Sequence, residues 1–341
     1  MIVSGSAIVA GKTLLRQYGS TLHQESVLGD SGTKGHAEIN GPLNILMVGV
    51  DRRPDSAEPI RSDSIIIAHV NAAHDQAFLV SIPRDLAVQI PPYPKTGYRG
   101  GRDKINAAFS YGSQGSAGLR GGVELLGLTI KHNFAGITFD GGAIVDFGGF
   151  QSVVNALGGV DMCIDTRVES VHVGTDAKGR FLPPDRGGKP VVYEPGCRHL
   201  EPWQALDYVR QRHGLPNGDY DRQRHQQQFL KAVLKEAKKQ GVATNPVKLF
   251  QIMKAAGGAL TVDLHGLQVE DWVFALSGVI DNDMVMLKTN AGRVNSTTLN
   301  GESAEQLTDD SASMFRSLRD DSLVQFVTAH PEFVSTDGAA G

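Results

Sequence analysis

Five charged residues stand at the ends of three short apolar runs near the start of the chain: Asp51, Arg61, Asp63, Arg84 and Asp85. A pair of carboxylates suits a hard divalent cation such as Mg²⁺, and guanidinium groups bind phosphate oxygens. Together these residue types predict a metal-assisted phosphate site. The prediction requires that the ends of the three runs meet in the folded chain.

The three apolar runs are the elements that can bring these charges together. Residues 45–50, 65–70 and 78–82 are rich in β-branched residues and are bounded by turn residues, a pattern typical of buried strands. Strands that lie side by side place their terminal residues along one edge of a sheet, where side chains converge without disturbing the core. Helical and strand-like patterns alternate further along the chain, which indicates an α/β fold. We predict helices at 123–132, 149–157, 202–210, 222–239 and 309–320, and strands at 136–140, 160–164 and 283–289.

Four arginines flank the loop between the helices predicted at 202–210 and 222–239: Arg210, Arg212, Arg222 and Arg224. The cluster indicates either an anion-binding corner or a solvated basic surface. Lys104 stands at the first turn of a further predicted helix, which Asp103 is expected to cap. A lysine there opposes the helix macrodipole, which indicates an anionic partner, although a solvated lysine gives the same pattern.

The glycine-rich stretch at 112–122 matches neither the G-x-G-x-x-G nor the Walker A spacing. We predict that it is a flexible loop, and its spacing disfavours a nucleotide-sugar enzyme. A second stretch, residues 171–198, is rich in glycine, proline and charge and is predicted to be a long loop that carries at most a hairpin.

The composition is that of an ordinary soluble protein with a sizeable core, since 40% of the residues are hydrophobic and 21% are charged. The net charge of −4 and the lack of a helix-turn-helix pattern argue against nucleic acid as a partner. No stretch approaches the roughly 20 apolar residues that a membrane span needs. The apolar residues 1–11 are either the end of a longer span or an ordinary start of the chain.

The domain boundaries follow from these patterns. We predict an N-terminal helix and linker at 1–41, which includes a helix at 12–28 and follows a truncated membrane anchor. A catalytic domain at 42–240 comes next. It is followed by a C-terminal α/β extension at 241–330, packed on the same domain, and by a disordered tail at 331–341. In the extension we see no constellation of chemically active residues.

The chain has two cysteines, Cys163 in a predicted strand and Cys197 in a Pro-Gly turn. A disulfide between a strand and a turn is compatible with this placement and would imply an oxidising compartment. Two separate thiols are equally compatible with it.

Six motifs stand in an order that resembles the LytR-CpsA-Psr (LCP) family: GVDRR, IRSDSI, SIPRD, KINAAF, FGGFQSVVNALGGV and ALDYVRQRHGLPNGDYDRQRHQQQFL. The part after residue 240 is similar to actinobacterial members. The resemblance implies an α/β/α sandwich with a central mixed β-sheet flanked by helices. It also implies attachment by an N-terminal anchor to the outer, extracytoplasmic face of the cell membrane.

The activity implied by the resemblance is a Mg²⁺-dependent phosphotransfer, with Mn²⁺ as an alternative ion. A cell-wall glycopolymer would move from a polyprenyl-pyrophosphate carrier to peptidoglycan. Matched by position, Asp51 and Asp63 would hold the metal. The pyrophosphate would be bound by Arg61, Arg84, Lys104, Arg210, Arg212, Arg222 and Gln226. The catalytic residues would be Asp63, Arg84, Arg210 and Arg212, with Asp63 or Asp85 as the base.

Several alternative functions are compatible with the same residues. The same site could hydrolyse polyprenyl pyrophosphate, or the protein could be a non-catalytic polyprenyl-phosphate-binding regulator of the envelope, as the older family label of transcriptional attenuator suggests. The polymer could be teichoic acid, capsule or arabinogalactan. A lipid tunnel would be lined by phenylalanines that could equally be plain core: Phe109, Phe147, Phe150 and Phe229. The family usually has an arginine where this chain has His225, with Arg224 one position earlier.

Overall fold

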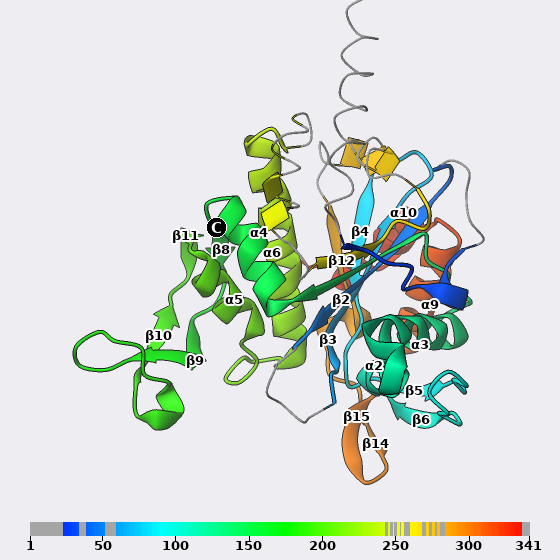
Figure 1. Cartoon of the computed structure of the whole chain (residues 1–341), viewed down its shortest axis with the longest axis horizontal. Helices are drawn as coiled ribbons and strands as arrows, with labels where there is room; N and C mark the ends of the chain where they lie inside the picture. The colour runs from blue at the N-terminus through cyan, green and yellow to red at the C-terminus, as the bar shows by residue number, and fades with distance from the viewer. Residues whose placement is uncertain are drawn as a thin grey trace, which may run out of the picture.

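A mixed β-sheet of seven strands runs through the middle of the molecule, with helices on both of its faces (Figure 1). The computed structural model describes residues 23–33, 39–51, 59–242, 245, 248, 251–252, 254–255, 260–267, 271–272, 275–276, 278–279 and 284–335. The strand order is β1-β12-β7-β2-β3-β4-β13. The bounds are β1 His23–Gln24, β2 Leu43–Val50, β3 Ser62–Val70, β4 Ala77–Ser81, β7 Gly141–Asp146, β12 Leu260–Asp263 and β13 Val285–Lys288. This architecture confirms the predicted α/β/α sandwich.

The three apolar runs are the neighbouring strands β2, β3 and β4. β3 pairs antiparallel with both β2 and β4, while β2 pairs parallel with β7 and β4 pairs parallel with β13. The end of β2, the start of β3 and the end of β4 therefore lie at the same edge of the sheet, as the charged site requires. β12 and β13, from the part of the chain after residue 240, belong to the same sheet.

One predicted strand is wrong. Residues 136–140 are not a strand, and β7 begins directly after them. Ile137 and Phe139 are buried among helix side chains, while the Asp140 carboxylate accepts hydrogen bonds from Asn44 N (2.8 Å) and Thr33 Oγ1 (2.9 Å). The pattern of residues 136–140 thus reflects burial and a single isolated bridge between Gly32 and Phe139, whereas the two glycines that open β7 obscure an inner strand of the sheet.

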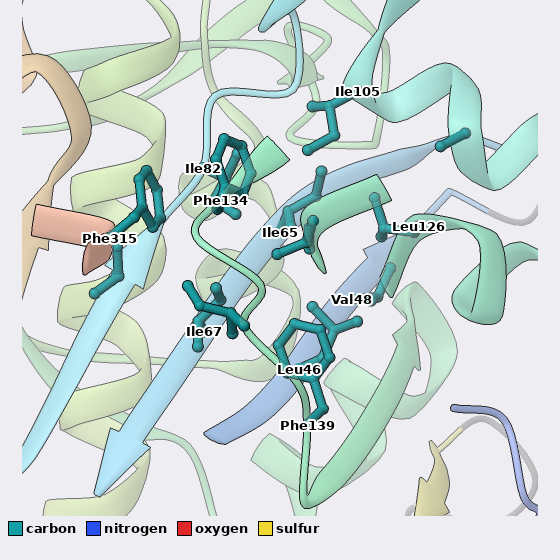
Figure 2. Packing of buried hydrophobic residues seen from close by; sticks show 14 of the residues in the cluster. Leu46, Val48, Ile65, Ile67, Ile82, Ile105, Leu126, Phe134, Phe139 and Phe315 are labelled. Atoms are coloured by element: carbon teal, nitrogen blue, oxygen red, sulfur yellow. The ribbon is translucent and has the colours of Figure 1, made fainter. Parts of the chain in front are cut away.

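The alternation of side chains along the strands divides the core between the two faces of the sheet. Leu46, Val48, Ile65 and Ile67 point to the face covered by α2, α3 and α9, where they form the largest buried cluster (Figure 2). Ile66 packs with Leu79 on the opposite face, against α6. The helices are α2 Ile105–Gly112, α3 Gly118–Asn133, α4 Phe147–Ala156, α5 Pro202–Arg210, α6 Asp219–Lys239, α9 Asp309–Arg319 and α10 Leu323–Ala329.

The glycine-rich stretch is not a flexible loop, because most of it forms the end of α2, the 3-10 helix η3 (Gly115–Ala117) and the start of α3. A Cβ atom on Gly112 would lie 2.2 Å from the carbonyl oxygen of Gly121, and one on Gly121 would lie 2.2 Å from that of Gly112. The two helices therefore approach each other closely through backbone atoms that cannot move aside.

Gly121→Ala is expected to lower the free energy of unfolding by about 1–3 kcal/mol, as overpacking in a core does. In an open helix the same change stabilises by roughly 0.5–1 kcal/mol. Gly148→Ala is the matched control, since Gly148 is exposed in α4 and an added Cβ atom would lie 3.4 Å from its nearest neighbour, Asp146 Oδ1. Urea unfolding of both variants measures the difference, and equal stabilities would contradict the packing argument.

A second, smaller core lies beside the sheet and includes α4, α5 and part of α6 (Figure 1). The stretch predicted as a long loop at 171–198 lies largely in three strands, and two of them form the hairpin that the sequence allowed. They are β9 Val168–Thr175, β10 Lys189–Tyr193 and β11 Gly196–Leu200, with the 3-10 helix η4 at Pro184–Arg186. β9 pairs with β10, and β11 pairs with β8, Val160–Ile164. Phe150 and Phe229 stack in this core, 4.2 Å apart, whereas Phe109 lies in the main core.

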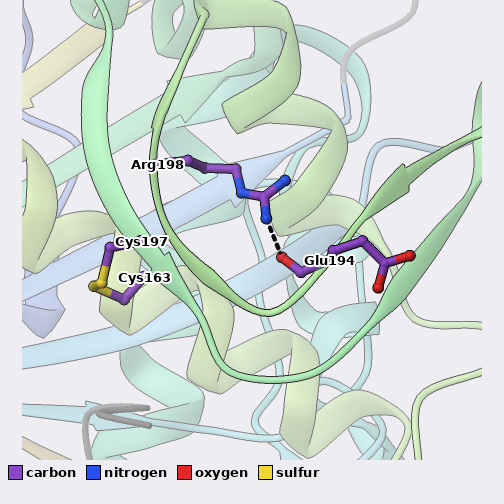
Figure 3. The surroundings of a disulfide bond; sticks show 4 residues. All are labelled: Cys163, Glu194, Cys197 and Arg198. Atoms are coloured by element: carbon purple, nitrogen blue, oxygen red, sulfur yellow. Dashed lines mark hydrogen bonds between the residues drawn. A yellow bond between two sulfur atoms is a disulfide. The ribbon is translucent and has the colours of Figure 1, made fainter.

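Cys163 and Cys197 form a disulfide, which settles the question that their spacing left open (Figure 3). The two residues are direct cross-strand partners in the antiparallel pair β8–β11. The bond closes a sequence separation of 34 residues, which contains the whole β9–β10 hairpin.

Both predicted terminal segments differ from the structure. Residues 23–28 form β1 and an extended stretch, and the rest of the helix predicted at 12–28 lies outside the described residues. Val27 and Leu28 are fully buried, and the 3-10 helix η2 (Gly29–Ser31) follows, so this part of the predicted linker is packed. At the other end, η8 (Pro331–Phe333) and Ser335 N, which donates to Met286 O (2.7 Å), hold part of the predicted tail on β13.

Trp203 is 43% exposed and Leu234 is 37% exposed, although both are at positions that helical spacing assigns to a buried face.

No helix among the residues described is both long and apolar enough to cross a membrane. The remaining strands are β5 Ala87–Ile90 with β6 Gly101–Lys104, and β14 Ser296–Leu299 with β15 Glu302–Glu305.

Candidate functional site

The end of β2, the start of β3 and the end of β4 form one edge of the sheet, which we call the rim. Asp51 directly follows β2, Asp63 lies at the start of β3, and Arg84 follows β4 after Ile82 and Pro83. The pairing of β2 with β3 shifts register here, because Val50 faces Ser62 while Gly49 faces Ser64. Asp63 is the extra residue of this bulge, a device that redirects a side chain at the end of a strand.

Arg84 is the centre of the charges at the rim. Its Nη1 donates a short hydrogen bond to Asp63 Oδ1, and its Nε lies 3.7 Å from Asp85 Oδ2 and 3.8 Å from Asp219 Oδ1. Asp219 is the first residue of α6. The Arg84 guanidinium therefore connects the end of the sheet to the helix α6. Burial alone would lower the pKa of Arg84, but the three carboxylates outweigh it and raise that pKa.

Arg222, in the first turn of α6, brings a second guanidinium to the Asp219 carboxylate and to the backbone carbonyl of Asp63. Its Nη2 donates to the carbonyl oxygen of Asp63 (2.8 Å) and lies 2.7 Å from Asp219 Oδ1. The residue is only 6% exposed. Burial lowers the pKa of Arg222, Asp219 opposes that shift, and the neighbouring charge of Arg84 adds to it.

The two arginines retain donor capacity that the described residues do not use. The Nε atoms of Arg84 and Arg222 are both buried, and neither makes a hydrogen bond to any described residue. A buried guanidinium donor without an acceptor is costly, and a bound oxyanion would satisfy it. Two guanidinium groups that share Asp63 and Asp219 therefore form a candidate anion site, in which the carboxylates balance the guanidinium charge.

Lys104 reaches the rim from the start of α2. Its Nζ lies 3.7 Å from Asp85 Oδ1 and 3.4 Å from Glu302 Oε2, which are the anionic partners that its unfavourable position predicts. Lys104 itself is the N-cap residue of α2, so the expected cap by Asp103 is wrong. The carboxylate of Asp103 instead accepts hydrogen bonds from Lys104 N and Tyr111 OH.

Among the remaining predicted phosphate ligands, Gln226 is connected to the start of β3 at the rim. Gln226 is one helical turn after Arg222, accepts from Ser64 Oγ (2.8 Å) and donates to Val209 O (3.5 Å). That contact ties the end of α5, where Arg210 and then Arg212 follow, to the start of β3. Both of these arginines are half-buried, whereas Arg61 is exposed beside the rim.

The donor set at Asp51 and Asp63 decides whether the predicted metal fits. Both are hard carboxylate ligands on neighbouring strand ends, and within the described part of the chain no group of three or more His, Cys, Asp or Glu side chains is arranged to hold a metal ion by itself. Two carboxylates completed by phosphate oxygens and water are a common way to bind Mg²⁺. The residues present therefore fit a Mg²⁺ ion that substrate helps to hold.

The comparison with known proteins is consistent with this geometry. A model of the LytR_cpsA_psr family matches residues 13–325. The chain belongs to the LytR_cpsA_psr family. The resemblance seen in the six sequence motifs is thereby confirmed.

Members of the family with similar sequences work on cell walls by name. The chain is 31% identical over 213 residues to the polyisoprenyl-teichoic acid–peptidoglycan teichoic acid transferase TagU of Bacillus cereus, covering 61% of this chain and 58% of that protein. It is 31% identical over 202 residues to the probable cell wall biosynthesis protein LcpB of Corynebacterium glutamicum, covering 59% and 40%. The chain spans about half the length of the curated relatives it matches.

Solved structures of the family share the fold. A structure of TagT bound to LI-WTA superposes with a TM-score of 0.60 at 22% identity, over 85% of this chain and 94% of that one. TagV of Bacillus subtilis gives 0.60 at 22% identity, over 83% and 98%.

At His225 the family resemblance predicts an arginine. Arg224 and His225 turn away from the rim toward Asp165, with Arg224 Nε 2.8 Å from Asp165 Oδ2 and His225 Nε2 3.6 Å from Asp165 Oδ1. Arg224 also pairs with Asp221 (2.7 Å), and His225 is fully buried against the ring of Tyr208. The four arginines of the helix–loop–helix corner are thus divided, because Arg224 serves a separate internal cluster.

The charges of that internal cluster are consistent with a structural role. Burial would raise the pKa of Asp165, but His225 and Arg224 outweigh it and lower the pKa to about 2. Burial also lowers the pKa of His225, and Asp165 only partly opposes that shift. The cluster holds α6 against the turn after β8.

Several residues lie at the rim of this family member although their place there was not predicted from the sequence. Asp219 joins the two guanidinium groups, and it could have been found from its position three residues before Arg222 on one helix. Glu302 and Glu305 also lie here, which corrects the view that the C-terminal part has no chemically active group. Burial raises the pKa of Glu305, as do Asp219 and Asp85, against hydrogen bonds from Asn295 and Tyr220. No sequence signal connects Glu305 to residues that lie more than 80 positions away.

Proposed function

We propose that this protein is a phosphotransferase that moves a cell-wall glycopolymer from a polyprenyl-pyrophosphate carrier to a hydroxyl group of peptidoglycan, on the outer face of the cell membrane. The observation that carries the proposal is the pair of guanidinium groups, Arg84 and Arg222, gathered on Asp63 and Asp219 with buried and unused Nε donors. The names of similar proteins, which are teichoic acid transferases, support the same class of reaction.

The reaction needs stabilisation of charge more than covalent chemistry. The acceptor hydroxyl oxygen attacks the phosphorus that carries the polymer, a new P–O bond forms, and the phosphoanhydride bond breaks to release polyprenyl phosphate. The hydroxyl proton passes to a carboxylate, for which Asp63 and Asp85 are the candidates. Negative charge grows on the leaving phosphate, and preorganised guanidinium donors in a partly buried site stabilise it.

The roles of single residues follow the positions described above. Arg84 and Arg222 would bind the pyrophosphate directly, with Lys104, Arg210, Arg212, Gln226 and Arg61 around them. Asp51 and Asp63 would hold Mg²⁺, which neutralises phosphate charge when bound. The Arg84 guanidinium, which Asp63 holds at the rim, would bind a phosphate oxygen of the donor.

The test is a transfer assay with a polyprenyl-pyrophosphate-linked glycopolymer and peptidoglycan. We expect covalent polymer–peptidoglycan product and one polyprenyl phosphate released for each polymer transferred. Release at the same rate without peptidoglycan would make the protein a hydrolase. Donor binding without turnover in the presence of Mg²⁺ would make it a binding or regulatory protein. Either result overturns the proposed transfer.

Removal of divalent ions should reduce transfer by at least about 100-fold, because the ion supplies several kcal/mol of charge stabilisation at the phosphates. The measurement is the initial rate in EDTA, followed by titration with Mg²⁺ or Mn²⁺. Restoration by either ion is the expected result. Full activity in EDTA would exclude Asp51 and Asp63 as ligands of a required metal.

A further inference from the structure

A buried tyrosine joins the C-terminal part of the chain to the first turn of α6. Tyr220 is 4% exposed, and its hydroxyl donates to Glu305 Oε2 (2.9 Å) and accepts from Asn290 Nδ2 (3.0 Å). Glu305 ends β15 of the hairpin at the bottom of Figure 1, and Asn290 belongs to η7, Thr289–Gly292. Two groups from one segment of chain therefore hold a single phenol from both sides.

The held residue lies between two residues of the candidate site. Asp219 and Arg222 flank Tyr220 in the same helical turn, and both contact the anion site at Asp63 and Arg84. Neighbouring residues in a helical turn move together, so a shift of the phenol moves the Arg222 guanidinium and the Asp219 carboxylate with it. Small displacements of positioning groups cost large factors in rate.

The two partners of the phenol are themselves fixed. Asn290 adopts a positive φ of 54° and is 4% exposed, and its Oδ1 accepts from Thr308 N (3.0 Å) and Ser311 Oγ (2.9 Å). Glu305 N donates to the carbonyl oxygen of Asp85 (3.0 Å), next to Arg84 in the chain. The segment thus contacts the rim both through α6 and through the turn after β4.

We propose that Tyr220, held between Asn290 and Glu305, is a positioning residue that sets the first turn of α6 at the phosphate site. On this view the part of the chain after residue 240 takes part in phosphoryl transfer by fixing Arg222 and Asp219 relative to Arg84. The inference rests on the proposed function. It differs from a plain stabilising role because it predicts a loss of turnover that exceeds any loss of folded protein.

The decisive variant is Tyr220→Phe, which keeps the ring and removes only the hydroxyl. Tyr93→Phe is the matched control, since the buried Tyr93 donates to Glu124 Oε2 (2.8 Å) in a tyrosine–glutamate pair away from the rim. We expect kcat of Tyr220→Phe to fall about tenfold, the equivalent of one lost hydrogen bond, with KM for the donor within about threefold of wild type. Tyr93→Phe should keep kcat within about twofold at a similar change in melting temperature.

Variants of Glu305, which accepts the hydrogen bond of the phenol, provide an independent test if Tyr220→Phe folds poorly. Glu305→Gln keeps an acceptor oxygen for the phenol and should retain most of the turnover, whereas Glu305→Ala should lose about as much as Tyr220→Phe. Wild-type kcat in Tyr220→Phe, equal losses in both tyrosine variants, or equal effects of Gln and Ala at position 305 would each overturn the proposal. A wild-type protein without transfer activity would instead overturn the proposed function, and this inference with it.

Discussion

Arg84→Ala is expected to reduce transfer from a polyprenyl-pyrophosphate donor by at least about 100-fold, because removal of one preorganised donor at a developing oxyanion costs roughly 10²–10³ in turnover. Arg84 contacts Asp63, Asp85 and Asp219, so its removal also leaves three carboxylates without the cation that they share. Their mutual repulsion would weaken binding of an anionic donor as well. Steady-state rates over a range of donor concentrations measure both effects.

Two companion variants separate the loss of charge from a loss of fold. Arg84→Lys keeps a positive charge but cannot donate two parallel hydrogen bonds, so an intermediate rate is expected. Arg102→Ala removes an exposed arginine of the neighbouring strand β6 and should leave the rate unchanged. Near-normal turnover of Arg84→Ala, at a melting temperature close to that of the wild type, would defeat the assignment.

The central part of the candidate site could be predicted from the sequence because its residues stand at the ends of strongly patterned strands. β2, β3 and β4 follow one another in the chain and pair as neighbours, so Asp51, Asp63 and Arg84 had to meet at one edge. Arg222 could be added because a helix returns it to the same strands. The α/β fold class followed from the same patterns, whereas the mixed sheet and its two helical layers followed from the family resemblance.

The contributions of the C-terminal part could not be predicted in the same way. Glu302 reaches Lys104 across a separation of 198 residues, and Glu305 reaches Tyr220 across 85. Such contacts depend on the turn geometry of η7 and on the β14–β15 hairpin, whose polar residues read as ordinary surface. A periodic pattern reports burial and local pairing, but it does not report which distant loop a side chain will meet.

The division of the arginine cluster shows a second limit. Arg222 and Arg224 are two positions apart on α6, which places them about 200° apart around the helix axis. One guanidinium therefore faces the rim while the other faces Asp165 and Asp221. Their closeness in the sequence suggested a single cluster of arginines. The geometry of the helix places the two side chains in different sites.

Replacement of the disulfide is expected to destabilise the smaller core strongly. The bond closes a sequence separation of 34 residues, for which the loop-entropy relation gives about 4 kcal/mol of stability at 25 °C. The double variant Cys163→Ser/Cys197→Ser should therefore unfold at a clearly lower urea concentration than the wild type. Both cysteines are exposed on strands of the β8–β11 pair, so little of the loss comes from packing.

A reductant supplies the internal control for this prediction. Wild-type protein in dithiothreitol should fall to the stability of the double variant, while the variant itself should not respond to the reductant. Transfer activity measured well below the unfolding transition should persist in both cases, because the disulfide lies in the smaller core, whereas Arg84 and Arg222, which we propose bind phosphate, lie at the rim. A loss of less than about 1 kcal/mol would mean that the β9–β10 hairpin and its flanking strands hold together by their hydrogen bonds and packing alone.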